Sequence, residues 1–205
     1  MLVSEKNKAT FIHIPKTGGS SLARILSRNA FNHLPERIKC NKNYVKNPLE
    51  WTTKHSRMHE LDMRYQNFFC FAFLRNPWDL MVSSFSWWTQ KAKAKIRKNH
   101  GDNLKAKGFK SFIKSDSSYI NECYHKNEGQ LYWLNNKVDF IGKFENIQQD
   151  FDIICDKIGI PRQILPHANK TNHEHYSEYY DDETREIVEK KYIKDIEYFS
   201  YEFGE

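Results

Sequence analysis

The chain of 205 residues has few cysteines, and they are not spaced as in disulfide-rich or zinc-binding proteins. No two of them form a C-x-x-C pair, and although His55 and His59 are four residues apart, no cysteine or further histidine stands at zinc-finger spacing to them. Neither a disulfide framework nor a bound metal is therefore expected. The four are Cys40, Cys70, Cys123 and Cys155, of which Cys70 and Cys155 fall among apolar residues and are predicted to be core thiols.

Long apolar segments are also absent. No run of residues approaches the length that crosses a bilayer, and the mean hydropathy is −0.80. The N-terminal stretch MLVSEKNKAT lacks the apolar region of a signal peptide. The sequence therefore predicts a cytoplasmic protein without a membrane anchor, and its length predicts one domain over residues 1–205.

Negative charge is scarce in one segment only. Residues 91–110 hold eight Lys/Arg and one Asp, whereas the rest of the chain holds 24 basic and 25 acidic residues, so the net charge of +6 arises in this segment. A solvated helix face or loop is the favoured interpretation, and a positive rim that attracts an anionic ligand is the alternative. Aromatic residues are sparse within the basic run, so nucleic acid is not expected as a partner.

Three apolar segments, each followed by a helical pattern, predict the fold class. They cover residues 11–14, 68–74 and 138–144. The second, FFCFAFL when read from Phe68, is typical of a strand buried on both faces of a parallel sheet. The alternation of strands and helices predicts an α/β domain of three layers, with a central parallel sheet flanked by helices.

Cap residues predict where later helices begin and end. Asn146, with Gln149 three residues on, predicts a capping box for a helix that ends at Gly159. Asp181 or Asp182 is expected to cap a last helix that continues to about Tyr198. Two shorter helices are expected at residues 109–114 and 129–135.

The stretch FIHIPKTGGSSL, residues 11–22, has the pattern of a strand, a glycine turn and a helix start. The two glycines permit positive φ angles, and the N–H groups and dipole of a helix N-terminus attract an anion. A lysine adds positive charge and hydroxyl groups add donors, so this stretch predicts a phosphate or sulfate site. An ordinary turn with an exposed lysine is the alternative. The candidate residues are Lys16, Thr17, Gly18, Gly19, Ser20 and Ser21, and Ser20 or Ser21 is expected to cap the helix.

This turn differs from the common nucleotide-binding loop. In that loop, Lys-Ser/Thr follows the glycines and its hydroxyl holds Mg²⁺. Here Lys16 precedes both glycines, and no Lys-Ser/Thr follows them. The sequence therefore predicts anion binding that does not require a metal.

A second anion site is predicted after the strand at 68–74. Arg75 stands at its carboxyl end, Pro77 suits the first turn of a new helix, and Ser83 lies about two turns into that helix. Ligands of open α/β sheets bind at such strand ends, and a guanidinium can grip a phosphate with two parallel hydrogen bonds.

These two motifs together resemble the paired signatures of the sulfotransferases that use 3′-phosphoadenosine 5′-phosphosulfate (PAPS). The likeness is to the carbohydrate branch, which includes the heparan sulfate 2-O-sulfotransferases and bacterial relatives, and it covers nearly the whole chain. It implies a P-loop-like sulfotransferase fold, PAPS as co-substrate and a hydroxyl acceptor on a carbohydrate. Further motifs that carry it are VDFIGKFENI and a closing pattern of Asp195, Ile196, Phe199 and Tyr201.

The resemblance also implies roles for particular residues. The glycine turn, residues 16–21, would hold the 5′ end of PAPS, and Arg75 with Ser83 would hold its 3′-phosphate. Lys16 would stabilise the departing phosphate, and a histidine between the two motifs would be the base. His55 is the chosen base, with His59 and Glu60 as rivals. Residues placed near the ligands with less support are Lys170, over the nucleotide, and Gln130, Trp87 and Trp88, in the acceptor cleft.

Two other functions compete with sulfuryl transfer. A kinase-like nucleotide enzyme is disfavoured by the missing metal-binding hydroxyl after the glycines. A binding module that retained the nucleotide pocket but lost turnover would carry the same binding residues. The acceptor itself is not specified by the sequence.

Overall fold

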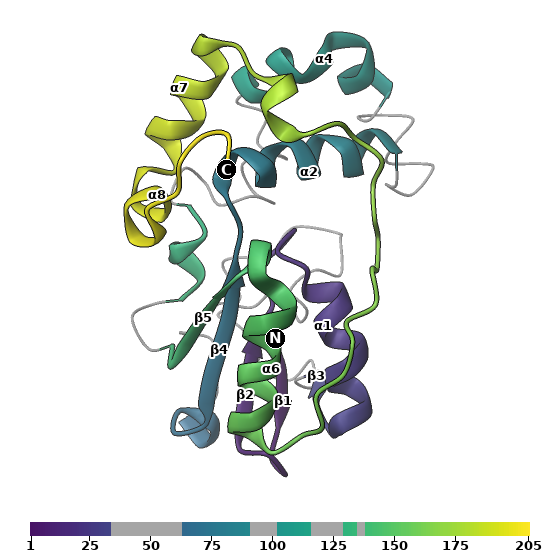
Figure 1. The fold of residues 1–205 in the computed structure, drawn as a ribbon, viewed down its shortest axis with the longest axis vertical. Coiled ribbons are helices and arrows are strands. Elements are labelled where there is room, and N and C mark those ends of the chain that lie inside the picture. The colour runs from purple at the N-terminus through teal and green to yellow at the C-terminus, as the bar shows by residue number, and fades with distance from the viewer. Residues whose placement is uncertain (34–62, 91–101, 116–128, 135–137) are drawn as a thin grey trace, which may run out of the picture. The chain divides into compact units, whose positions relative to one another are not determined.

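The computed structural model describes residues 1–33, 63–90, 102–115, 129–134 and 138–205, which fall into two compact units (Figure 1). One unit, here called the sheet unit, comprises Met1–Leu74 and Tyr132–Ala168. The other, the helical unit, comprises Arg75–Leu131 and Asn169–Glu205. The assignment of the whole chain to one sulfotransferase domain stays a prediction.

In the described residues of the sheet unit, five strands form a sheet in the order β3-β1-β2-β4-β5. Strands β2, β4 and β5 pair in parallel, with Phe71 opposite Phe11 on one side and Phe140 on the other. The three strands expected from the sequence are therefore present and pair in parallel, although β2 ends at Ile12 and not at the expected Ile14. The bounds are β1 Leu2–Ser4, β2 Ala9–Ile12, β3 Asn32–His33, β4 Phe69–Leu74 and β5 Phe140–Lys143.

The sheet is mixed rather than parallel throughout. Strand β1 runs antiparallel to both β2 and β3, and neither β1 nor β3 was expected from the sequence. Both are short, three and two residues, and a strand of that length contains too little alternation to be recognised.

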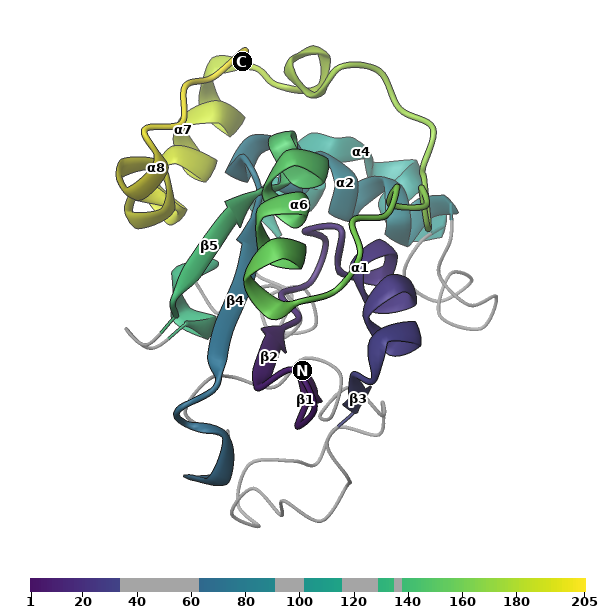
Figure 2. The same cartoon turned by 60° about the horizontal axis from the view of Figure 1, so that its bottom comes forward.

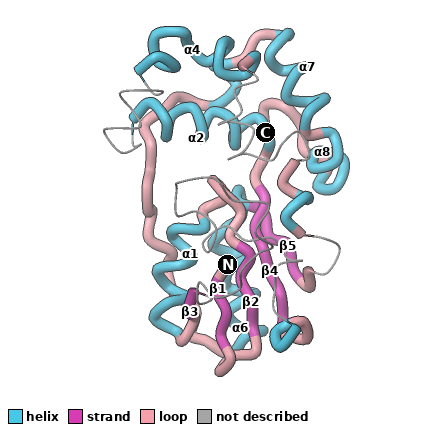
Figure 3. The backbone as a smooth tube through the Cα atoms, turned by 180° about the vertical axis from the view of Figure 1, so that it is seen from behind, coloured by secondary structure: helices cyan, strands magenta, loops and turns pink. Residues whose placement is uncertain are grey.

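Helices α1 (Gly19–Leu26) and α6 (Ile147–Ile158) pack on one face of the sheet (Figures 2 and 3). Alternate strand residues point to that face, and the Phe11 and Phe71 rings stack there at 5.3 Å. The helices add the apolar stripe expected for 147–158, which the structure confirms. The fully or nearly fully buried members are Phe11, Phe71, Phe73, Leu22, Ile25, Leu26, Phe151, Ile154, Cys155 and Ile158.

The opposite face of the central strands is buried as well. Ile12, Cys70, Ala72 and Leu74 are at most 1% exposed, so β4 is covered on both faces as its apolar sequence predicts. Both described cysteines are core thiols, as expected. Burial, with a smaller contribution from Asp139, raises the pKa of Cys70 to about 12.

The expected capping box at the start of α6 is wrong. Asn146 is the N-cap residue, but its side chain makes no capping hydrogen bond. The carboxylate of Asp150 instead accepts the Lys143 N–H at 2.6 Å, since a 3₁₀ turn at 144–146 precedes the helix. Gly159 ends α6 in the left-handed conformation, φ 69°, as predicted.

The helical unit packs aromatic side chains between helices. Its core includes Trp78, Trp88, Phe109, Phe112 and Tyr192, all at most 7% exposed. Its helices are α2 Pro77–Gln90, α4 Asp102–Lys114, α7 Asp182–Lys191 and α8 Ile193–Phe199.

Short 3₁₀ helices occur in the described residues of both units. They are η1 Ser27–Asn29, η3 Met63–Tyr65, η5 Leu131–Trp133, η6 Phe144–Asn146 and η7 Tyr176–Tyr179.

The last predicted helix begins as expected but is divided. Asp181 caps α7, accepting the Thr184 N–H at 2.8 Å, and the Thr184 hydroxyl accepts the Asp181 N–H in return. The helix is interrupted at Tyr192, φ −113° and ψ 22°, a buried residue that separates α7 from α8. The short helix expected at 109–114 is the end of the longer α4, which has a break at Gly108.

No helix among the described residues is long and apolar enough to cross a membrane.

Candidate active site

The loop between β2 and α1 contains the first predicted anion site. Hydrogen bonds between the loop's own residues hold its conformation. Thr17 is fully buried, and its hydroxyl donates to the Ile14 carbonyl at 3.1 Å. The Ile14 N–H donates to the Ile12 carbonyl at 3.2 Å. The Thr17 hydroxyl proton is thus used inside the loop, where it fixes the turn rather than facing outward.

Backbone conformation in this loop is unusual. Lys16, a non-glycine residue, lies at φ 69°, and Gly18 lies at φ 80°. A left-handed lysine costs on the order of 1 kcal/mol, and such strain persists only where the surrounding structure imposes it. Strained backbone of this kind clusters at ligand-binding sites. The lysine and the two glycines are therefore held in one defined turn.

The two glycines allow close packing that a side chain would block. A Cβ atom on Gly18 would lie 2.4 Å from Cδ1 of Ile147, and one on Gly19 would lie 2.1 Å from Cδ2 of His13. The His13 ring is 3% exposed and stacks on Phe11 at 5.5 Å. The His13 ring therefore packs against Gly19 in the first turn of α1, a contact that was not expected from the sequence. Its position two residues after Phe11, on the same face of the strand, was the available signal.

The start of α1 differs from the prediction. Gly18 is the N-cap residue, and its carbonyl accepts the N–H groups of Ser21 and Leu22 at 2.9 and 3.3 Å. Neither Ser20 nor Ser21 caps the helix, because the left-handed glycine already makes the turn. The Ser21 hydroxyl accepts the Ala168 N–H at 3.1 Å and so links the segment that follows α6 to the first turn of α1. Lys16 and Ser20 are both half-buried beside this turn.

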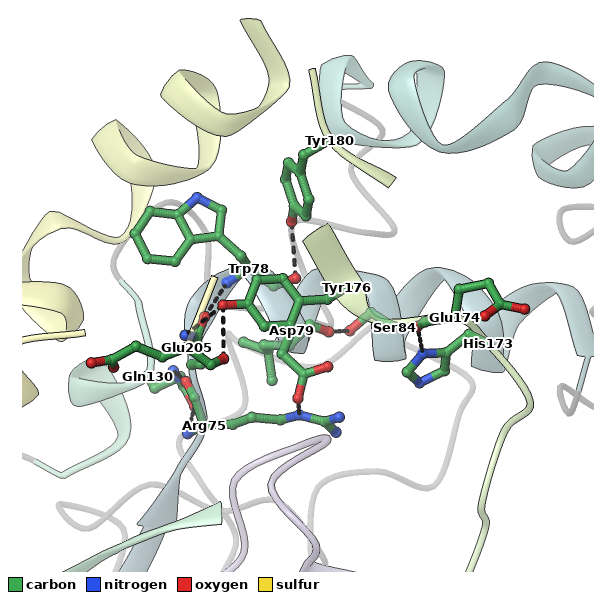
Figure 4. Close-up of polar contacts among 12 residues, drawn as sticks. Arg75, Trp78, Asp79, Ser84, Gln130, His173, Glu174, Tyr176, Tyr180 and Glu205 are labelled. Atoms are coloured by element: carbon green, nitrogen blue, oxygen red, sulfur yellow. Dashed lines mark hydrogen bonds and ion pairs between the residues drawn. The ribbon is translucent and has the colours of Figure 1, made fainter. Parts of the chain in front are cut away.

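The second predicted anion site lies where β4 ends and α2 begins (Figure 4). Arg75 is 8% exposed, and its Nε donates to Asp79 at 2.7 Å, within the first turn of α2. Pro77 is the first residue of α2, as predicted, and the Asn76 side chain caps the helix by accepting the Trp78 N–H at 3.1 Å. Ser83 is buried on the same helix.

Gln130 does not line an acceptor cleft, contrary to expectation. It is fully buried, and its amide bonds both polar groups of the Arg75 backbone (Figure 4). Trp88 is a core residue at 1% exposure, whereas the adjacent Trp87 ring is half-buried. Lys170 is exposed and follows a left-handed residue, Asn169, at φ 60°.

The predicted base lies outside the described residues. This applies to His55 and to both rivals, His59 and Glu60. The basic segment is described only from Asp102 onward, where it forms part of α4. Among the described residues, no group of three His, Cys, Asp or Glu side chains is arranged to hold a metal ion.

Together these features describe an α/β protein with a glycine turn of defined conformation before a helix. In the turn, a strained lysine precedes a left-handed glycine and a helix N-terminus, which concentrates positive potential. Strand β4, parallel to β2, leads directly into a second segment with a buried arginine. Both segments follow the carboxyl ends of adjacent parallel strands, where α/β proteins bind ligands.

Comparison with known proteins identifies the family. Residues 1–202 match the model of the sulfotransferase family, and the chain belongs to that family. Carbohydrate sulfotransferase 11 from mouse and from rat is 21% identical over 187 residues, which cover 78% of this chain and 53% of each relative. The matched region thus spans about half the length of these two relatives. An uncharacterized protein from Archaeoglobus fulgidus is 29% identical over 112 residues, 55% of this chain and 85% of that protein. No solved structure matches the chain.

Proposed function

We propose that this protein transfers the sulfuryl group of PAPS to a hydroxyl group, with a carbohydrate as the acceptor. The observation that carries the proposal is the β2–α1 turn, in which Lys16 and Gly18 are held at positive φ immediately before a helix N-terminus. The turn alone would suit any phosphate or sulfate, and membership of the sulfotransferase family favours a sulfuryl donor as its ligand. The carbohydrate acceptor rests on the likeness to carbohydrate sulfotransferase 11.

In this proposal, the turn binds the 5′ end of PAPS. Backbone N–H groups of residues 17–20 and the hydroxyl groups of Ser20 and Ser21 donate to phosphate and sulfuryl oxygens. Thr17 contributes through its backbone, because its hydroxyl proton is used by Ile14. Gly18 and Gly19 allow the turn to pack against Ile147 and His13, because neither glycine has a side chain.

The 3′-phosphate is assigned to the helical unit. Arg75 would bind it, because the Nε of its guanidinium is oriented by Asp79 and a guanidinium is suited to bidentate phosphate binding. Ser83 would donate its hydroxyl, and Lys170 would close over the nucleotide. The sulfotransferase arrangement of three layers with a P-loop-like turn belongs to the same proposal and is supported by the parallel order β2-β4-β5.

Sulfuryl transfer is an in-line displacement in which positioning and charge stabilisation supply most of the rate. The acceptor oxygen forms a bond to sulfur while the bond between sulfur and the bridging oxygen of the 5′-phosphate breaks. Lys16 would stabilise the negative charge that develops on this departing phosphate. His55 would accept the proton of the acceptor hydroxyl, since an unperturbed imidazole is largely neutral at pH 7. No step of this reaction requires a metal.

Isothermal titration calorimetry tests the donor. We expect the protein to bind 3′-phosphoadenosine 5′-phosphate (PAP) without Mg²⁺ and much more tightly than ATP. Tighter binding of ATP with Mg²⁺ would favour the kinase-like alternative. Transfer of label from [³⁵S]PAPS to a panel of oligosaccharides, lipids and small alcohols tests turnover and identifies the acceptor. Binding of PAP without transfer to any of these would favour the binding module.

The base is tested separately. His55→Ala should abolish transfer and leave PAP affinity nearly unchanged, because a base for the acceptor does not contact the nucleotide. His59→Ala is the matched control and should retain turnover. A fully active His55→Ala enzyme would remove this residue as the base.

A further inference from the structure

Three buried residues from distant parts of the helical unit form a continuous chain of hydrogen bonds that ends at Arg75. The carboxylate of Asp195, in α8, accepts the backbone N–H groups of Gln130 at 2.7 Å and Leu131 at 3.1 Å. It also accepts the Gln130 side-chain Nε2 at 3.3 Å. Both Asp195 and Gln130 are 0% exposed, and the bonds between Asp195, Gln130 and Arg75 are buried.

The Gln130 amide continues the chain to the backbone of Arg75. Its Oε1 accepts the Arg75 N–H at 2.9 Å, and its Nε2 donates to the Arg75 carbonyl at 2.7 Å. Arg75 directly follows Leu74, the last residue of β4. The glutamine amide thus supplies the donor and the acceptor that a neighbouring strand would supply, and an amide side chain is the kind that offers both.

Asp195 determines which way this amide points. A carboxylate only accepts hydrogen bonds, so it holds the Nε2 end of Gln130 toward itself and the Oε1 end toward the Arg75 N–H. The chain also depends on Gly129, because a Cβ there would lie 2.8 Å from the carboxylate. A glycine at φ 75° therefore allows residues 129–131 to approach Asp195 closely.

We infer that Asp195 and Gln130 are positioning residues that fix Arg75 for binding the 3′-phosphate of the nucleotide. With the backbone held at its N–H and carbonyl, and Nε held by Asp79, the Arg75 side chain has few remaining orientations. A guanidinium that is already oriented loses little conformational freedom when it binds a phosphate. This inference rests on the proposed function, and it assigns a physical role to the aspartate of the closing sequence pattern.

The test measures the contribution of the 3′-phosphate alone. Calorimetry gives the affinities for PAP and for AMP, which lacks the 3′-phosphate, and their ratio isolates that group. Gln130→Met keeps the size of the side chain and removes both bonds to Arg75. We expect it to lower the PAP/AMP affinity ratio by about tenfold, because buried backbone groups lose their partners. The affinity for AMP should stay within about twofold.

Asp195→Asn is the second variant and guards against misfolding of the first. It preserves shape but replaces one accepting oxygen with an amide donor, so either the Leu131 N–H or the two Gln130 groups lose their acceptor. The PAP/AMP affinity ratio of Asp195→Asn should fall by a factor similar to that of Gln130→Met. Arg75→Ala should lower the PAP/AMP affinity ratio most of the way to 1. Adding Gln130→Met to Arg75→Ala should lower this ratio no further, because Gln130 acts through Arg75.

Gln148→Met is the matched control. Gln148 in α6 also bonds backbone groups, accepting the Leu165 N–H at 2.9 Å and donating to the Gln163 carbonyl at 3.1 Å. This variant should lose thermal stability and retain the wild-type ratio. An equal fall of the ratio in Gln148→Met would show a general effect of destabilisation and overturn the inference.

The remaining outcomes separate the inference from the function on which it rests. A wild-type protein that binds PAP no better than AMP would overturn both. A large wild-type ratio that Arg75→Ala removes, but that both Gln130→Met and Asp195→Asn leave intact, would overturn the positioning role alone.

Discussion

The two candidate anion-binding segments reach their geometry in opposite ways. In the β2–α1 turn, the Thr17 hydroxyl bonds a carbonyl three residues away, and Gly18 caps the helix that follows it. At Arg75, the backbone is bonded by Gln130, 55 residues away, and Gln130 is in turn held by Asp195, 65 residues further on. The first segment is built locally, and the second is assembled by the folding of its whole unit.

This difference has a physical consequence. A local turn requires little loop closure, so it can form as soon as β2 and α1 meet. The Arg75 segment requires three distant segments to be in place at once, and its buried bonds form only when water is excluded. Partial unfolding of the helical unit is therefore expected to disturb the Arg75 segment more readily than the β2–α1 turn is disturbed.

Within these two segments, the largest effect is expected at Lys16. Lys16→Ala should lower kcat by about 100-fold, roughly 3 kcal/mol in the barrier, if its ammonium stabilises the departing phosphate. Steady-state kinetics with [³⁵S]PAPS measures this. Lys16→Gly is the matched control, because glycine accepts the φ of 69° without strain but also lacks the charge. Turnover that recovers in Lys16→Gly would assign the loss to backbone strain instead.

A second effect tests whether the first turn is self-contained. Gly19→Ala should reduce stability by about 1–3 kcal/mol, because the added Cβ would meet the His13 ring. The double variant His13→Ala/Gly19→Ala should recover most of that stability in thermal unfolding, since the small side chain at 13 makes room. Failure to recover would mean that the Gly19 backbone itself, rather than this contact, is sensitive to substitution.

At Arg75, a smaller effect tests the orientation of the side chain. Asp79→Asn should weaken PAP binding by about 1 kcal/mol, because Nε loses a charged acceptor at 2.7 Å. Calorimetry measures the change. Tighter binding would contradict this expectation and would show that the Asp79 charge repels the ligand more than its hydrogen bond orients the arginine.

The smallest effect concerns a long-range contact that is exposed. Lys110 bonds Asp181 at 2.6 Å, and both side chains are about half exposed. The Lys110 ammonium, followed by the Thr184 N–H, lowers the pKa of Asp181 in the folded protein. Its contribution to stability is therefore fully present above the unfolded pKa of about 3.9 and is lost as the pH falls through the lowered folded value.

Asp181→Asn tests this pH dependence. The variant keeps a capping oxygen but loses the charge, so it should melt slightly below wild type at pH 7, and the difference should shrink below about pH 4. Thermal unfolding across this range measures it. A constant difference would point to the cap rather than the charge. A small effect here beside a large one at Gln130 would show that burial, and not sequence distance, makes a long-range bond matter.

Features that depend on neighbouring residues were predictable from the sequence. The strands at β2, β4 and β5, the start of α2 at Pro77 and the end of α6 at Gly159 each follow from a local pattern. The glycine turn was predictable for the same reason. Cap chemistry was less so: Gly18 replaced the expected serines, and Asp150 replaced the expected box at Asn146. In each case a residue a few positions away competed for the same backbone groups.

Contacts between distant residues were not predictable. The expected place of Gln130 in an acceptor cleft was wrong because the side chain is buried against Arg75, 55 residues away. Asp195 was noted in the sequence only as part of a pattern. Its bonds to residues 130 and 131 exist because α8 folds back onto that segment.

By itself, the sequence determined the α/β class, the strand-turn-helix motif and the lysine at position 16 within that motif. These features depend on the steric and charge preferences of adjacent residues. Only the tertiary structure decided that a glutamine and an aspartate, at 130 and 195, hold the backbone of Arg75. The reason is that a buried polar side chain must find partners wherever the fold brings them, and sequence distance places no limit on where that is.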